Sequence, residues 1–219
     1  RLRIFYSSAL FSYRAQLSWL NPSMWLTMKL VLSSSQMAFF VFVGLYIRGP
    51  SVIPFIAIGN ALQTVTWNVV FSVVNITGHD KWDGTLPLLL ATPASRLPVF
   101  IGRAMIHVFD GMLSVGISFF FAASLFGVNF GSANVLALIV TVFLTAFTMA
   151  GFGLLIGGLS FYYREPMIFA NIFTYALLIF CGVNFPVQDL PAPAQVVSYA
   201  FPLTYGLTAA RQAISGAGL

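Results

Sequence analysis

The sequence predicts an all-α integral membrane protein. Of its 219 residues, 59% are hydrophobic and only 7% are charged, and its mean hydropathy is +0.92. Soluble domains carry about 25% charged residues, so this composition excludes an ordinary soluble protein. The apolar residues also fall into runs long enough to cross a bilayer, which takes about 20 residues for a hydrocarbon core of about 30 Å. We therefore expect several membrane-spanning helices joined by short polar connections.

Charge and cysteine content exclude several other classes. The net charge of +5 is not a nucleic-acid signal, because the basic residues stand at the ends of apolar runs, where they orient a membrane protein. The single cysteine, Cys181, excludes an intrachain disulfide, and we expect it to serve packing. The sequence has no Gly-x-x-x-x-Gly-Lys-Ser/Thr loop and no His/Cys cluster with metal spacing. We predict that the chain is not an enzyme and binds no metal, cofactor or nucleic acid itself.

Residues 1–22 are expected to form an N-terminal interfacial helix, followed by a transmembrane domain over residues 23–219. Arg3, Ser7 and Arg14 recur at helical spacing, opposite an apolar face. A basic amphipathic helix of this kind lies in the headgroup plane, and Asn21-Pro22 ends it. A first buried core helix is the alternative interpretation.

Five transmembrane helices are expected after this segment. In the first, Lys29 is expected to reach back to the interface. In the second, uncharged polar residues recur every three or four positions and must face protein or water. The fourth carries Gly153 and Gly157 in a close-packing helix motif. The expected spans are Met24–Ile47, Val52–Ile76, Leu97–Leu125, Val135–Phe161 and Pro166–Gly182, and the polar stripe of the second is Asn60, Thr64, Asn68, Ser72 and Asn75.

The end of the chain is expected to be re-entrant. Four prolines, Pro186, Pro191, Pro193 and Pro202, divide it into pieces too short to cross a bilayer. Broken backbone at membrane depth is tolerated where protein or a watery cavity covers it. Residues 183–210 should therefore dip into one leaflet and return.

A polar stretch, residues 79–95, separates the second and third spans. Each of its charges would cost about 2.5–3.5 kcal/mol at the membrane centre, so the stretch lies in water. Its leucines still need an apolar partner, which suggests docking to another protein. The expected docking residues are Asp80, Lys81, Trp82, Asp83, Gly84, Thr85, Leu86 and Leu89. A mere solvated loop is the alternative.

Basic residues set the orientation. With the N-terminus in the cytosol, eight of the ten Lys and Arg residues fall on the cytosolic side, and only Arg48 and Arg211 fall outside. This is a strong positive-inside signal. It places the docking stretch in the cytosol and the proline-broken segment outside.

These motifs resemble those of the type-2 ABC exporter permeases, the membrane subunits that move polysaccharides, glycolipids or drugs out of bacteria. The cytosolic motif is Gly84-Thr85-Leu86-x-Leu88-Leu89-x-x-Thr92-Pro93. The outer motif is Phe185-Pro186-x-x-x-Leu190-Pro191, then Phe201-Pro202-Leu203-Thr204-Tyr205, with Arg211 after it. The chain departs from the family pattern at Pro87, where Glu is usual, and at Asp80 and Asp83, which replace a commoner Arg-Glu pair.

The resemblance implies a multi-pass protein of the bacterial plasma membrane with its N-terminus in the cytoplasm. The docking stretch would be a coupling helix that seats in a groove of an ATP-hydrolysing subunit, which binds the ATP and magnesium. Two permeases, identical or homologous, would pair with two such subunits and export cargo by alternating access. A sixth span is expected from the family but is not part of these residues.

Two groups of polar residues within the spans are candidate sites. The first group would line a translocation path for neutral or sugar-bearing cargo, with interhelical hydrogen bonding as the alternative. Its members are Ser33, Ser34, Ser35, Gln36, Asn60, Thr64, Asn68 and Tyr175, and nearby aromatics such as Phe39, Phe40 and Phe173 could stack on sugars or simply pack. The second group, Arg103, His107 and Asp110, would form a structural charge network bridged by His107, with a proton relay as the alternative.

Two other functions stay open at this stage. A proton-coupled secondary transporter would need a titratable group at the membrane centre, and the spans offer only the Arg103, His107 and Asp110 group near one end. A membrane enzyme acting on lipid-linked sugars would need a catalytic acid or base, and the outer face offers only Asp189.

Overall fold

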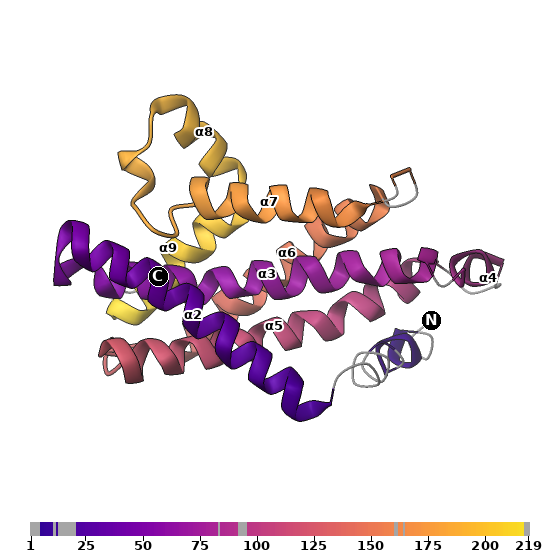
Figure 1. Cartoon of the computed structure of the whole chain (residues 1–219), viewed down its shortest axis with the longest axis horizontal. Helices are drawn as coiled ribbons and strands as arrows, with labels where there is room; N and C mark the ends of the chain where they lie inside the picture. Colours follow the sequence, from indigo (N-terminus) through magenta and orange to yellow (C-terminus); the bar gives the residue numbers. More distant parts are fainter. Residues whose placement is uncertain are drawn as a thin grey trace.

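The computed structural model describes residues 5–10, 12, 21–82, 84–91, 96–159, 162–163 and 165–216. Every regular element within these ranges is a helix, which confirms the all-α class (Figure 1). Residues 5–10 and 12 are helical, and residues 1–4, 11 and 13–20 of the expected interfacial helix lie outside the described residues. The later elements are α2 (Pro22–Arg48), η1 (Pro50–Val52), α3 (Ile53–Trp82), α4 (Leu86–Ala91), α5 (Arg96–Phe126), α6 (Val135–Gly158), α7 (Pro166–Phe180), η3 (Val187–Asp189), α8 (Ala192–Ala200) and α9 (Pro202–Ser215).

Four of the described helices are long and apolar enough to cross a membrane, namely α2, α3, α5 and α6. They correspond to the first four expected spans. The fifth expected span corresponds to α7, whose 15 residues measure about 22 Å at 1.5 Å per residue. Four of the five expected spans therefore have the required length, and α7 is a shorter apolar helix.

Local sequence signals explain several helix ends. Pro22 stands at the start of α2, where its missing N–H and fixed φ suit the first helical turn. Gly49 ends α2 with φ of +81°, a conformation that costs glycine little. The Asn134 side chain caps α6 by accepting a hydrogen bond from the Ala137 N–H at 3.1 Å. Such signals fix where each helix stops and its connection begins.

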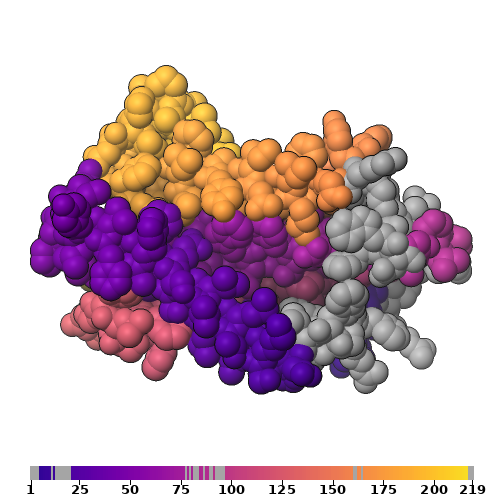
Figure 2. Space-filling view, viewed as in Figure 1, coloured from indigo at the N-terminus to yellow at the C-terminus, as the bar shows by residue number. Residues whose placement is uncertain are grey.

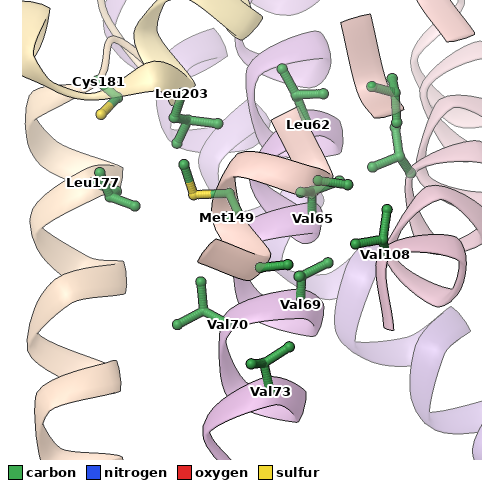
Figure 3. Packing of buried hydrophobic residues seen from close by; sticks show 14 of the residues in the cluster. Leu62, Val65, Val69, Val70, Val73, Val108, Met149, Leu177, Cys181 and Leu203 are labelled. Atoms are coloured by element: carbon green, nitrogen blue, oxygen red, sulfur yellow. The ribbon is translucent and has the colours of Figure 1, made fainter. Parts of the chain in front are cut away.

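Helix α3 is the centre of the molecule. In its most apolar 18-residue stretch 78% of the residues are buried, against 17% in α2, because α2, α5, α6 and α7 all pack on it. Figure 3 shows the resulting core, in which one face of α3 meets side chains from four other helices. The α3 residues there are Leu62, Val65, Val69, Val70 and Val73, and they meet Val108, Met149, Leu177 and Leu203.

Small residues allow this close packing. A Cβ at Gly153 of α6 would lie 2.9 Å from the Val73 Cβ of α3, so only glycine fits without a shift. Gly153 is one of the two glycines of the expected close-packing motif. Helices without large side chains at the contact can approach closely inside a membrane, and α6 uses this to reach α3.

The last helices fold back over the rest of the chain. The Ser198 hydroxyl donates to the Phe180 carbonyl at 2.6 Å, which ties α8 to the end of α7. Gly206 of α9 lies against Thr145 near the middle of α6, and the Asn134 N–H donates to the Ala213 carbonyl at 2.8 Å. Helix α9 therefore runs beside the first half of α6. The expectation that residues 183–210 dip into one leaflet stays a prediction, with which this pairing is consistent.

Candidate translocation groove and docking end

A groove of about 560 Å³ lies between α2 and α3 and reaches α5. In Figure 2, α3 lies recessed between α2 and α7. Helix α2 crosses α3 at an angle rather than running alongside it (Figure 1), which leaves part of α3 uncovered. The groove is lined by Trp25, Met28, Lys29, Leu32, Ser33, Ser35, Gln36, Thr64, Trp67, Asn68, Phe71, Ser72, Asn75 and Asp110.

The structure brings most of the expected path residues together in this groove. Its lining includes five of them, Ser33, Ser35, Gln36, Thr64 and Asn68. Three others lie outside the lining. Ser34 donates its hydroxyl to the Leu30 carbonyl at 2.6 Å, Asn60 donates to the Asn184 side chain at 2.8 Å, and Tyr175 packs edge-on against Trp67.

The groove combines an aromatic wall with uncharged polar groups. Trp67 and Phe71 of α3 stack with their ring centroids 4.9 Å apart, and Trp25 of α2 contributes a further indole. Ser35 is exposed, and Ser72 and Asn75 are half-buried. Sequence reasoning missed this aromatic wall. The available signal was that Trp67 and Phe71 stand four residues apart and flank the polar stripe of α3.

A buried ion pair closes one side of the groove. The Lys29 ammonium lies 2.7 Å from the Asp110 Oδ2, and the two side chains are 7% and 13% exposed. Lys29 also donates to the Ser114 hydroxyl at 2.6 Å and the Asn68 Oδ1 at 3.3 Å, and lies 4.8 Å from the centre of the Trp25 ring. The expectation that Lys29 reaches back to the interface is wrong. Asp110 on the neighbouring helix supplies a counter-charge, and a paired charge is tolerated within a membrane protein.

The expected charge network of α5 is arranged differently from the prediction. Arg103 pairs with Asp80 of α3, whereas Asp110 pairs with Lys29 of α2. His107 is buried, and its Nδ1 has no hydrogen-bond partner among the described residues, so it does not bridge its two neighbours. Spacing along one helix could not reveal the pairing, because both counter-charges come from other helices.

The docking stretch lies at one extreme end of the molecule (Figure 1). Helix α3 continues to Trp82, Gly84 turns the chain with φ of +66°, and the short helix α4 follows. Gly84 and Thr85 are exposed, and Leu88 of α4 is 70% exposed. This helix therefore stands clear of the transmembrane core.

The individual docking residues are only partly described. Asp83, Thr92 and Pro93 lie outside the described residues, and for Lys81, Trp82, Leu86 and Leu89 only the backbone is described. Asp80, one of the expected docking residues, is turned toward α5. Its carboxylate is 13% exposed and faces the Arg103 guanidinium, because α5 places that arginine beside the end of α3.

The outer motif attaches the end of the chain to the start of α3. The Arg211 Nη2 donates to the carbonyl oxygens of Phe55, Gly182 and Val183 at 3.2, 3.0 and 3.1 Å. Its guanidinium also lies 3.5 Å from the centre of the Phe55 ring. The arginine thus clamps α9, the connection after α7, and α3 together.

Two comparisons with known proteins give a match. A family model described as ABC-2 type transporter matches residues 7–214. The linearmycin resistance permease protein LnrN of Bacillus subtilis (strain 168) is 26% identical over 161 residues, which cover 71% of this chain and 41% of that relative. The chain thus spans less than half the length of this relative. No solved structure matches significantly.

Proposed function

The chain belongs to the ABC-2 type transporter family, and from this premise we propose that it is the permease subunit of an ATP-driven exporter. Family members are the membrane subunits of ABC transporters and work with an ATP-binding cassette subunit. The chain itself has no nucleotide-binding loop. In our proposal a separate ATPase subunit binds ATP and magnesium. The same subunit binds the cytosolic segment around α4.

The groove between α2 and α3 supports a role in moving cargo. Hydroxyl and amide groups at membrane depth have no hydrogen-bond partner in lipid, so they are expected to face water, cargo or another protein. Ser35, Ser72 and Asn75 are such groups and are accessible in the groove. This polar surface within otherwise apolar helices is the observation on which the proposal rests.

The groove chemistry favours uncharged, amphiphilic cargo. Lys29 and Asp110, the two charged residues of its lining, neutralise one another at 2.7 Å. A charged cargo would have to compete for one member of this pair and leave the other buried and unpaired, which is strongly unfavourable. Aromatic rings and uncharged polar groups suit a hydrophobic small molecule, a glycolipid or a sugar chain.

A second permease copy is expected to cover the groove. The exposed polar face of α2 and α3 would then lie between two copies, where alternating access exposes it to one side and then the other. The copies are identical or homologous in this proposal, and the host is a bacterial plasma membrane. Native mass spectrometry of the complex would give the number of permease chains and ATPase subunits.

Blocking the groove tests this function. The chain and its ATPase subunit would be reconstituted in nanodiscs, and ATP hydrolysis measured with a neutral glycolipid, a neutral oligosaccharide and charged analogues of each, and also with linearmycin. We expect at least one uncharged compound to stimulate hydrolysis. Because Ser35→Trp fills the groove, it should weaken the apparent affinity for that compound about tenfold, which corresponds to about 1.4 kcal/mol.

Leu136→Trp is the matched control, since Leu136 is 74% exposed on α6 and outside the groove lining. It should leave stimulation unchanged. Stimulation by charged compounds alone, or stimulation that Ser35→Trp leaves intact, would contradict the proposal. Transport that survives loss of the ATPase subunit but is abolished by Asp110→Asn would instead support a proton-coupled transporter.

A further inference from the structure

Arg103 joins three elements at the docking end of the molecule. Its guanidinium binds both carboxylate oxygens of Asp80 at the end of α3, at 2.5 and 3.1 Å. Its Nε donates to the hydroxyl of Ser12 in the N-terminal helix at 3.2 Å. Both members of the ion pair are largely buried, with 17% and 13% of their side chains exposed. A two-point bond of this kind fixes direction as well as distance.

Asp80 in turn connects to the docking helix. The Thr85 hydroxyl donates to the Asp80 carbonyl oxygen at 3.3 Å, across the turn that Gly84 makes with its positive φ. Thr85 directly precedes α4. The base of α4 is therefore attached to the same residue that Arg103 holds.

The N-terminal helix packs directly on α5 beside this arginine. A Cβ at Gly102 would lie 2.6 Å from the Phe5 carbonyl oxygen, so the two backbones touch. Ser12, which accepts the Arg103 hydrogen bond, is only 8% exposed. The N-terminal helix is thus fixed to α5 and, through Arg103, to the end of α3.

Helix α5 carries this connection to the groove. It runs without interruption from Arg96 to Phe126, and Asp110 follows Arg103 by seven residues, which is about two helical turns and places both on similar faces. Asp110 holds Lys29 of α2 beside the groove. One rigid helix therefore bears an ion pair to the docking end and an ion pair to the groove.

We propose that Arg103 is a positioning residue that transmits movement of the docking segment to the groove. When α4 moves, the bond from Thr85 displaces Asp80. Asp80 then displaces α5 through Arg103. Helix α5 in turn displaces α2 through the pair of Asp110 and Lys29. This inference rests on the proposed function, because it requires an ATPase subunit that grips α4.

The test measures groove movement rather than cargo. The chain would carry Cys181→Ala and Ser35→Cys, with a bimane fluorophore on the new cysteine, in nanodiscs with the ATPase subunit. ATP should change the bimane emission of the otherwise unaltered chain. Arg103→Ala should reduce this change at least about fivefold, the lower range of coupling between sites, with ATPase binding and ATP hydrolysis retained. Asp80→Ala should reduce the change by the same factor when the ATPase subunit is saturating.

The double variant and a charge exchange separate coupling from general damage. Asp80→Ala with Arg103→Ala should be no worse than either single variant, since contacting residues are not additive. Asp80→Arg with Arg103→Asp should restore part of the response. Arg48→Ala and Asp189→Ala are the controls, because that pair is 55% and 48% exposed with 3.3 Å between its atoms, and both should keep the full response.

The outcomes distinguish this inference from the proposed function. If the unaltered chain binds no ATPase subunit, or binds it without any ATP-dependent bimane change, the proposed function fails. If the unaltered chain responds but Arg103→Ala responds equally, the positioning role is overturned. Additive losses in the double variant, or no recovery in the charge exchange with a folded protein, overturn it as well.

Discussion

At the residue scale, the bond between Lys29 and Asp110 is the main polar attachment of α2. Helix α2 buries few of its residues, yet Lys29 reaches a carboxylate and a hydroxyl on α5 and an amide on α3. The other helices pack on α3 through the apolar core, and Arg103 of α5 and Arg211 of α9 add polar contacts to it. Met37 and Val41 attach the second half of α2 to α3 by apolar packing. The position of the first half, and with it the width of the groove, therefore depends on the buried ion pair of Lys29 and Asp110.

Removing one member of this pair should be much worse than removing both. Lys29→Met leaves the Asp110 carboxylate buried without its counter-charge, and breaking a buried pair costs about 3–5 kcal/mol. Lys29→Met with Asp110→Asn leaves no net charge and should recover most of the lost stability. Thermal unfolding in detergent would measure both variants. A double variant less stable than Lys29→Met alone would contradict this account.

Single residues also show which contacts could not be predicted from the sequence. Lipid offers polar groups no partner, so the polar stripe of α3 had to face a protected surface, and Thr64 and Asn68 do line the groove. Asn60 belongs to the same stripe but bonds to Asn184, which follows α7 and is distant in the sequence. The partner of Asp80 likewise comes from another helix. Helical spacing predicts which residues share one face of a helix. Which other element packs on that face depends on tertiary packing.

At the element scale, the proline-broken segment of residues 183–210 depends on a close approach to α3. A Cβ at Gly59 would overlap the Val183 carbonyl oxygen and lie 2.8 Å from the Arg211 Nη2. Arg211 in turn binds that same carbonyl at 3.1 Å. Glycine at this position therefore lets the connection after α7 and the arginine of α9 meet on the surface of α3.

Gly59→Ala should loosen the proline-broken segment. The methyl group must displace backbone or the arginine clamp, and overpacking of this kind costs about 1–3 kcal/mol. Thermal unfolding and protease sensitivity of the segment around residues 183–191 would measure the effect. Gly116→Ala in α5 is the matched control, since a Cβ there meets nothing within 4 Å, and it should be neutral or slightly stabilising. Equal behaviour of the two variants would contradict the proposed close approach.

Elements differ in how well composition predicts them. The long apolar runs gave α2, α3, α5 and α6 close to their expected limits, because a helix is the form that satisfies backbone groups within lipid. The end of α3 was harder to predict. The helix continues past Ile76 to Trp82 through polar residues, since Arg103 on α5 supplies a partner for Asp80.

At the scale of the whole molecule, one ion pair lies at each of two opposite ends. One end holds the Asp80 and Arg103 pair beside the N-terminal helix. The other end holds the exposed pair of Arg48 and Asp189. The lengths of α2, α3, α5 and α6 separate these ends by the thickness of a membrane. The distribution of Lys and Arg residues predicts that the docking stretch and the proline-broken segment lie on opposite sides of the membrane. The positions of these two ends agree with that prediction.

Cysteine labelling tests which end faces the cytosol. In a Cys181→Ala background, Leu88→Cys and Gln188→Cys place one thiol at each end, and both native side chains are exposed. The positive-inside rule predicts that a membrane-impermeant maleimide labels Gln188→Cys on intact cells and labels Leu88→Cys only after permeabilisation. The reverse pattern would place α4 outside the cell, where no ATP-hydrolysing subunit could grip it. Because both the docking role of α4 and the coupling role of Arg103 require a cytosolic partner, that single result would remove the basis for both.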